Sequence, residues 1–184
     1  MDASVSYSWL AFWVYWIAAG IKAHATLISR QVNHLIVRFL VLLSLLLVVV
    51  SAHASTSKFN ERTTRHLAIR LIGLIIFYGG LTLAIWARRN LGSSWGMPMS
   101  ITKHPKLVTA GPYKWIRHPI YSGLLLALLG TALVSTHAWF FLFLASLVFI
   151  VYSSVQEEKT LSAQLPKDYP AYQKRTKMLI PHIF

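Results

Sequence analysis

The chain of 184 residues contains no cysteine. Structural disulfides, thiolate metal sites and cysteine nucleophiles are therefore excluded. Acidic residues are also scarce, with five Asp and Glu against 18 Lys and Arg, and the formal net charge is +13. Only 12% of the residues are charged, whereas a soluble domain carries about a quarter. The low charge content indicates a chain that lies largely in a membrane.

Apolar residues make up 55% of the chain, and the mean hydropathy is +0.53. Lipid admits only helices and closed barrels, because every backbone polar group must be paired within the protein. A barrel strand needs alternating polar and apolar positions, and residues 40–50 form an apolar run instead. We therefore predict an all-α polytopic membrane protein.

The apolar runs predict about five transmembrane helices, at about residues 7–28, 35–52, 68–87, 119–134 and 138–155. If the N-terminus is outside, 14 of the 18 Lys and Arg fall in the inside segments 22–38, 88–118 and 156–184. Basic residues concentrate in cytoplasmic loops. This orientation places the last two of these segments together on the cytoplasmic face of a bacterial inner membrane or an endoplasmic reticulum.

The same distribution bears on domains and partners. Residues 1–88 are expected to form a three-helix membrane region, and residues 89–184 a second region that folds with it as one unit. The excess positive charge suits anionic membrane lipids, and no fold signature of nucleic-acid binding accompanies it. We therefore expect membrane lipids as partners and no nucleic acid.

Residues 111–123, with the sequence GPYKWIRHPIYSG, are the most informative stretch. Pro119 opens an apolar run, and proline is favoured at the first position of a helix. Backbone N–H groups at a helix N-terminus attract anions, and the forked guanidinium of Arg117 suits a carboxylate. Arg117 and His118 thus predict a receptor for the carboxylate of an amino acid. The alternative is that both residues only anchor the helix to lipid headgroups.

Two of the five acids, Glu157 and Glu158, stand together where the last apolar run ends. A turn at residues 135–137 makes the last two predicted helices antiparallel neighbours, so both acids return to the level of His118. Ionisable residues at membrane depth are functional candidates by default. The alternatives are a salt bridge to Lys159 or Arg117, or simple solvation of the helix end.

Three aromatic residues, Tyr113, Trp115 and Tyr121, accompany these charges. Aromatic faces attract cations, including onium groups that have no N–H donor. Carboxylate-binding groups, acids and aromatic faces together predict a zwitterionic amino acid that bears a sulfonium. For each aromatic residue alone, anchoring at the membrane interface is the alternative.

Four motifs carry a family resemblance. They are Lys106-Leu107-Val108-Thr109-x-Gly111-x-Tyr113, Arg117-His118-Pro119-x-Tyr121-x-Gly123, Glu157-Glu158-x-x-Leu161 and Tyr169-x-x-Tyr172. Over about residues 90–184 the chain resembles the isoprenylcysteine carboxyl methyltransferase superfamily, and phospholipid N-methyltransferases are similar in the same region. The resemblance implies S-adenosylmethionine as methyl donor in a cytoplasm-facing pocket, and a lipophilic acceptor that arrives from the bilayer.

The resemblance also implies which residues contact the cofactor: Lys106, Leu107, Val108, Tyr113, His118, Pro119, Ile120, Tyr121 and Glu157. The transfer would be a direct in-line displacement without metal or covalent enzyme intermediate. As argued above, Arg117 would bind the carboxylate of an amino acid, and Glu158 or His104 would take a proton from an amine or hydroxyl acceptor. One departure concerns Ser153, where the prenylcysteine enzymes carry an arginine. It leaves the cofactor site intact and the nature of the acceptor open.

Two other functions fit parts of the pattern. A non-enzymatic scaffold or transporter subunit would use the polar clusters only as headgroup anchors. Membrane sterol reductases have a similar C-terminal region and use a nicotinamide cofactor, but the chain has no Gly-rich dinucleotide loop and is short for that group. Binding of S-adenosylhomocysteine would separate the methyltransferase from both.

Overall fold

The computed structural model describes residues 3–24, 67–92, 107–135, 137–181 and 183. The described residues form helices and contain no β-strand, only one isolated bridge between Ile116 and Lys177. This confirms the all-α prediction for this part of the chain. The elements are α1 (Ala3–His24), α3 (Leu67–Leu91), the 3₁₀ helix η3 (Gly111–Lys114), α4 (Pro119–Val134), α5 (His137–Gln164) and α6 (Asp168–Arg175).

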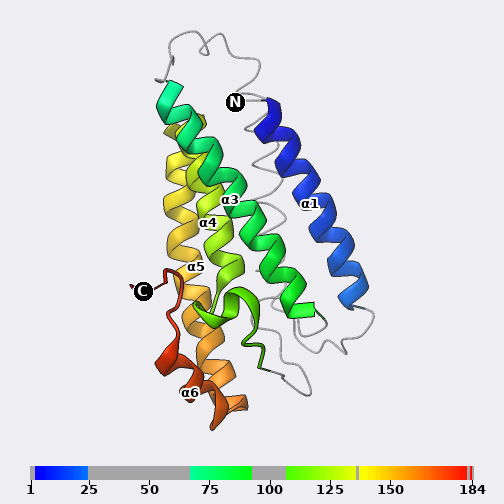
Figure 1. Cartoon of the computed structure of the whole chain (residues 1–184), viewed down its shortest axis with the longest axis vertical. Helices are drawn as coiled ribbons and strands as arrows, with labels where there is room; N and C mark the ends of the chain where they lie inside the picture. Colours follow the sequence, from blue (N-terminus) through cyan, green and yellow to red (C-terminus); the bar gives the residue numbers. More distant parts are fainter. Residues whose placement is uncertain (1–2, 25–66, 93–106, 136, 182, 184) are drawn as a thin grey trace.

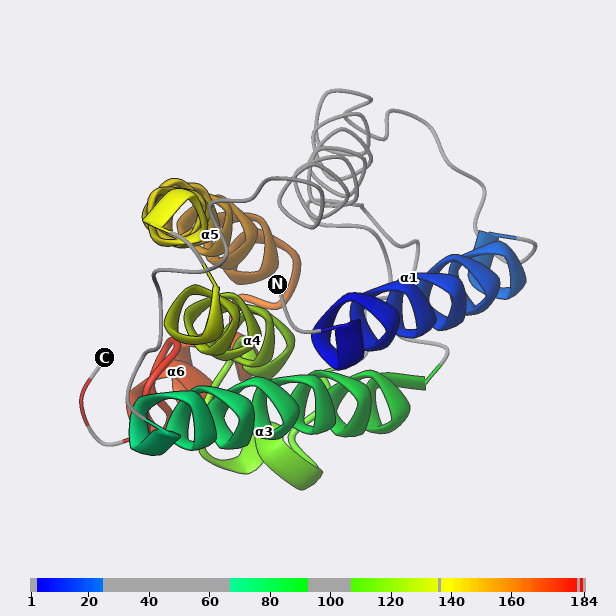
Figure 2. The same cartoon turned by 90° about the horizontal axis from the view of Figure 1, so that it is seen from above.

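Four long helices, α1, α3, α4 and α5, run along the longest axis of the molecule (Figure 1). Along the chain α3, α4 and α5 alternate in direction, and α4 lies between the other two when the bundle is seen from above (Figure 2). The short elements η3 and α6 lie at the same end of the bundle, where α4 begins (Figure 1). This end brings together the segments that contain the two polar clusters.

Glycines allow α3 and α4 to cross in close contact. A Cβ atom on Gly80 would lie 2.5 Å from the carbonyl oxygen of Gly123, and one on Gly73 would lie 3.1 Å from that of Gly130. Small residues let helix backbones approach in membrane proteins. Gly79 has open space beside it, so it does not contribute to this crossing.

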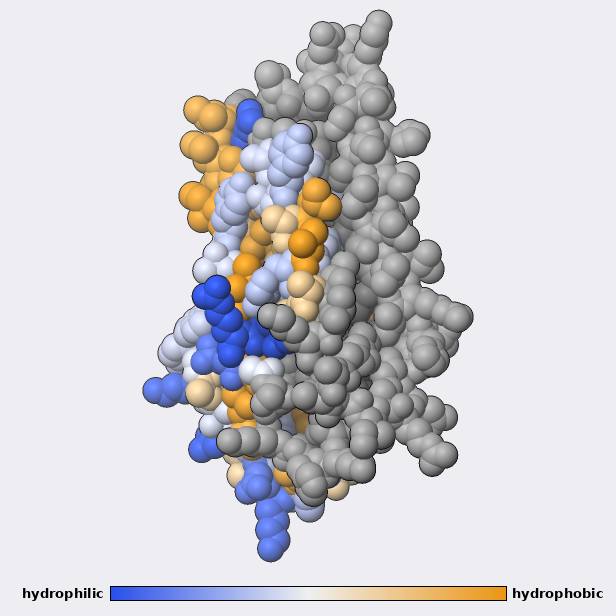
Figure 3. Space-filling view, turned by 90° about the vertical axis from the view of Figure 1, so that its right-hand side faces the viewer, coloured by the Kyte–Doolittle hydropathy of each residue, from blue (hydrophilic) through white to orange (hydrophobic). Residues whose placement is uncertain are grey.

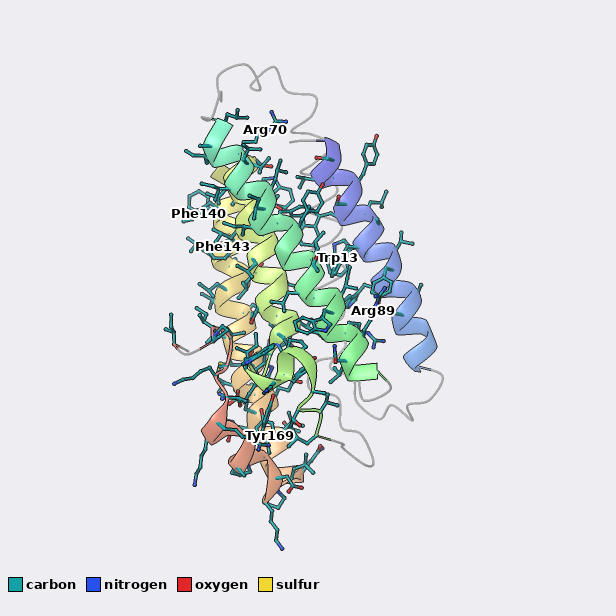
Figure 4. The ribbon with its side chains drawn as sticks, viewed as in Figure 1. Trp13, Arg70, Arg89, Phe140, Phe143 and Tyr169 are labelled. Carbon is teal, nitrogen blue, oxygen red and sulfur yellow. The ribbon has the colours of Figure 1, made fainter. Side chains whose placement is uncertain are left out.

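Helix α1 packs against the α3–α4 pair through aromatic residues. The ring of Trp9 lies 5.7 Å from that of Phe77, centroid to centroid, and its indole N–H donates a buried hydrogen bond of 3.0 Å to Thr131 Oγ. Thr131 in turn donates to the Ala127 carbonyl at 2.8 Å. Trp13 lies between α1 and α3 (Figure 4). The core thus joins α1, α3 and α4 through side-chain packing and two consecutive buried hydrogen bonds through Thr131.

The outer faces of α3 and α5 are apolar. Both helices are long and apolar enough to cross a membrane, and only 28% of the apolar window of each is buried. Ile75 on α3 and Val148 on α5 are more than two-thirds exposed, while Arg70 and Arg89 mark the two ends of α3 (Figure 4). In the space-filling view hydrophilic residues gather mostly below the apolar surface (Figure 3). These exposed faces are typical of a membrane protein.

The number of crossings stays a prediction. Helix α4 is apolar but has only 16 residues, and the second predicted crossing, residues 35–52, lies outside the described residues. The predicted bounds of the fourth crossing, 119–134, agree with α4.

The predicted end of the fifth crossing differs from the structure, because α5 continues to Gln164. The predicted segment ends at residue 155, where the apolar run stops. Gln, Glu, Lys and Leu are nevertheless good helix formers, and they carry the helix beyond the apolar run. The cluster Gln156–Glu158 therefore lies within α5, and its side chains are held at helical spacing.

Candidate functional site at the start of α4

The approach to α4 is fixed by a glycine and a proline. Gly111 has a φ of +60°, a left-handed conformation that glycine adopts without a steric cost. A Cβ atom there would also lie 2.5 Å from the side-chain oxygen of Asn90 on α3. Pro119 occupies the first turn of α4, as the sequence predicts, and His118 precedes it as the N-cap with φ at −122°. These residues place the His118 side chain at the start of the helix.

The chain after α6 returns to this start. Residues 176–180, here called the C-terminal strap, accept hydrogen bonds from the backbone N–H groups of Arg117 and His118. Arg117 donates to the Lys177 carbonyl at 2.8 Å and His118 to the Met178 carbonyl at 3.1 Å. Pro119 has no N–H. The backbone N–H groups of Arg117 and His118, which precede α4, are thus paired within the protein.

Arg117, two residues before α4, forms a salt bridge with Glu158 of α5. Arg117 Nε lies 2.6 Å from Glu158 Oε1, and Nη2 lies 3.4 Å from Oε2. The side chains of both residues are only 11% exposed. This salt bridge is one of the alternatives that the sequence left open, and it joins residues from the two polar clusters.

Further polar groups form hydrogen bonds with this pair. Gln173 of α6 donates to Glu158 Oε2 at 2.8 Å, and His118 Nε2 lies 3.2 Å from Oε1. Arg117 Nη1 donates to the carbonyls of Thr176, at 2.5 Å, and Gln173, at 3.4 Å. The Arg117–Glu158 pair therefore connects α4, α5, α6 and the C-terminal strap, and both oxygens of Glu158 are engaged.

Glu157 has a more open environment than Glu158. Its side chain is 32% exposed, and Oε2 accepts a hydrogen bond of 3.3 Å from the Tyr121 hydroxyl. His118 Nδ1 lies 3.8 Å from the same oxygen, and the rings of His118 and Tyr121 stack with centroids 5.6 Å apart. Glu157 thus offers an accessible carboxylate beside two stacked rings.

Buried tyrosines surround these acids. Burial raises the pKa of the Tyr113 phenol, and the nearby Glu157 carboxylate raises it further. Burial also raises the pKa of Tyr172 to about 12, although the charge of Arg117 opposes the rise. The Tyr172 hydroxyl donates a hydrogen bond of 2.6 Å to the Tyr113 carbonyl. Tyr169, at the lower end of the molecule in Figure 4, packs edge-on against Tyr172. The phenols therefore stay neutral around physiological pH.

The structure brings most of the predicted site residues together around the start of α4. Leu107 and Val108 are partly buried in the segment before η3, Pro119 is buried and Ile120 is partly buried. His104 and Lys106 lie outside the described residues. Whether any of these residues contacts a cofactor stays a prediction.

The sequence did not predict three hydrogen-bonding residues of this region. Gln173 carries no motif, and the Ser122 hydroxyl, which donates to the Leu179 carbonyl at 2.6 Å, resembles any other small residue in an apolar helix. Arg88 was counted as a loop charge but is buried, with Nη1 donating to the Gly92 carbonyl and Nη2 to that of Ala19 on α1. Its position in the last turn of α3 is the only sequence feature that distinguishes it from a loop residue.

The sequence model of the phospholipid methyltransferase family matches residues 69–168. This range is more than half of the chain and includes most of α3, all of α4 and α5, and both polar clusters. The chain belongs to the phospholipid methyltransferase family. The match confirms the resemblance inferred from the four motifs.

Two known proteins are similar to this family member. One is the solved structure of the eukaryotic intramembrane Ras methyltransferase ICMT, an isoprenylcysteine carboxyl methyltransferase, with 28% identity and a TM-score of 0.60. The match covers 73% of this chain and 52% of that chain, so the similarity spans about half of the solved enzyme. The other is the uncharacterised protein YpbQ of Bacillus subtilis (strain 168), 39% identical over 44 residues, which are 24% of this chain and 26% of YpbQ.

Proposed function

We propose that the protein is a membrane-embedded methyltransferase that uses S-adenosylmethionine and methylates a lipophilic acceptor, either a lipid or a small molecule that enters the bilayer. Membership of the phospholipid methyltransferase family supports this proposal. The observation that carries it is the partly exposed carboxylate of Glu157, held beside Tyr121 and His118 at the start of α4.

The residues at this place fit the cofactor chemically. The carboxylate of Glu157 would pair with the ammonium group of the cofactor's amino acid. The rings of Tyr113 and Tyr121 would lie near the sulfonium, since aromatic faces attract onium cations. S-adenosylmethionine supplies an already activated methyl group, so the protein has mainly to align the acceptor with it. Alignment of this kind can lower a barrier by about 7–11 kcal/mol.

The contacts favour a positioning role for the Arg117–Glu158 pair. Both oxygens of Glu158 are engaged by Arg117, His118 and Gln173, which leaves little capacity to accept a proton from a substrate. The N–H groups of Arg117 likewise donate to Glu158 and to two backbone carbonyls. We therefore infer that the pair holds His118 and the C-terminal strap in place.

A positioning role for Glu158 bears on which acceptors can be methylated without another base. A carboxylate acceptor carries no proton at neutral pH and needs no base, whereas an amine or hydroxyl needs one within hydrogen-bonding reach. His104 remains the other predicted base. We propose that the acceptor arrives from the bilayer and that the site faces the cytoplasm, in a bacterial inner membrane or an endoplasmic reticulum.

Glu157→Gln tests the cofactor site. The substitution keeps the size of the side chain and removes its charge. A charge-assisted hydrogen bond contributes about 1.5–3 kcal/mol, so we expect S-adenosylhomocysteine to bind about 10- to 100-fold more weakly to detergent-solubilised protein. Asp168→Asn is a matched control, because it removes the same charge at an exposed position at the start of α6.

Unchanged binding in Glu157→Gln would refute the assignment of Glu157. Absence of binding in the unmodified protein would instead favour a scaffold or transporter subunit. Transfer of a labelled methyl group to extracted native lipids, followed by mass analysis of the product, would identify the accepting atom. Transfer that is lost in Glu157→Gln and kept in Asp168→Asn is the expected result.

A further inference from the structure

A hollow with a volume of about 210 Å³ opens beside the C-terminal strap, on the polar end of the molecule. Its walls come from η3 and the residue after it on one side, and from the end of α6 and the strap on the other. Four cationic side chains line it, together with Trp115. They are Lys114, Lys174, Arg175 and Lys177, and we call this hollow the basic groove.

The charge of the basic groove has one sign. All four cationic residues are exposed, and none of the described residues that line the hollow is Asp or Glu. Glu158 lies behind the wall, but its charge is already compensated by Arg117, and its Oε2 also accepts from Gln173. The basic groove therefore presents uncompensated positive charge, which favours an anion.

Exposed aromatic and apolar residues lie in and next to the segments that line the basic groove. Trp115 is 50% exposed and lies 6.3 Å from the ring of Trp86, near the end of the apolar helix α3. Ile180, the last residue of the strap, and Ile183 are 49% and 74% exposed. Tryptophan is enriched where a protein crosses from lipid to water. The positive groove thus lies at the boundary between membrane and water.

We propose that the basic groove binds the phosphate headgroup of an anionic phospholipid, at a site distinct from that of methyl transfer. A soluble phosphate would satisfy the charges but would leave the exposed indole and isoleucine side chains in water. A lipid satisfies both, because its phosphate meets the lysines while its acyl chains stay in the adjoining bilayer.

The basic groove also shares a wall with the Arg117–Glu158 pair. Gln173 and Thr176 line the groove, and both contact Arg117 or Glu158 on the other side. A bound headgroup would therefore hold the strap against the start of α4. An anionic lipid should raise the thermal stability of the protein more than a zwitterionic lipid does.

The double variant Lys114→Gln and Lys174→Gln tests this site, with one substitution in each wall. Protein in detergent is titrated with phosphatidylglycerol or phosphatidylcholine, and bound lipid is counted by native mass spectrometry. Each lysine near anionic lipid contributes about 1 kcal/mol, so we expect phosphatidylglycerol to bind roughly thirtyfold more weakly to the variant. Lys159→Gln with Lys167→Gln is the matched control, since both lysines are exposed and lie outside the groove.

Three results would overturn the proposal. Equal losses in the two double variants would mean that net charge alone attracts the lipid. If glycerol phosphate displaces phosphatidylglycerol when both are at the same concentration, the site takes a soluble phosphate. No preference for phosphatidylglycerol over phosphatidylcholine would mean that the groove recognises no anion. None of these measurements needs a methyl donor, so their outcome is independent of the proposed activity.

Discussion

Replacing Arg117 by Met removes the cation from the salt bridge that joins the start of α4 to α5 and keeps much of the side chain's length. The change strands the carboxylate of Glu158, which is only 11% exposed, and leaves the Thr176 carbonyl without the donor at 2.5 Å. Glu158→Met strands the guanidinium in the same way. Breaking a buried ion pair from one side costs about 3–5 kcal/mol.

The double variant should lose less than the sum of the two single variants. With both charges gone, no buried ion is left without a partner, and two apolar side chains can pack in the space. We expect the two effects to be non-additive by about 2–3 kcal/mol. The free energy of unfolding in mixed micelles, titrated with a denaturing detergent, gives the four corners of this cycle.

A coupling below about 0.5 kcal/mol would refute the reasoning, because independent sites add within that margin. Arg89→Met is the control, since Arg89 is exposed at the end of α3 and surface changes usually stay within about 0.5 kcal/mol. A function for Arg117 as a receptor for a ligand carboxylate predicts a different result. Affinity for the ligand would then fall while the free energy of unfolding stayed nearly unchanged.

Two further predictions concern packing and pH. Gly80→Ala should destabilise the protein by about 1–3 kcal/mol through overpacking against Gly123, whereas Gly79→Ala, with open space beside it, should stabilise it by up to about 1 kcal/mol; equal effects in thermal unfolding would contradict the close crossing. The pKa of Tyr172 is raised to about 12, so the unfolded chain loses this proton first, and this phenol should lower stability by up to about 1.4 kcal/mol per unit between about pH 10 and 12. The other buried tyrosines add slopes of their own, so Tyr172→Phe should reduce the alkaline slope by the share of one proton, and an unchanged slope would contradict it.

The α4–α5 hairpin could be predicted from the sequence, and so could the proximity of the two polar clusters at its open end. Pro119 fixes where α4 begins, and the short turn near residue 135 makes α5 its antiparallel neighbour. These two constraints bring Glu157 and Glu158 to the level of His118. The distance between the clusters then follows from helix geometry alone.

Other parts of the site left little trace in the sequence. The end of α5 was placed too early because an apolar run measures contact with lipid, whereas helix propensity continued past residue 155. The partners of Arg117 could not be found because two of its acceptors are backbone carbonyls, one of them 59 positions away. A carbonyl is present at every residue and marks none of them. The pairing of Glu158 with Gln173 depends on the placement of α6, which only tertiary packing decides.

The C-terminal strap holds the start of α4 through its main chain, since Lys177, Met178 and Leu179 contribute carbonyl oxygens to Arg117, His118 and Ser122. These three hydrogen bonds do not depend on the strap's side chains, which have separate environments: Lys177 lines the basic groove, and Leu179 is buried with Leu125 and Ile150. A single inserted or deleted residue is a different event, because it would shift every carbonyl by one place and present the wrong one to each donor. The hydrogen bonds of this segment therefore fix its length, independently of its composition.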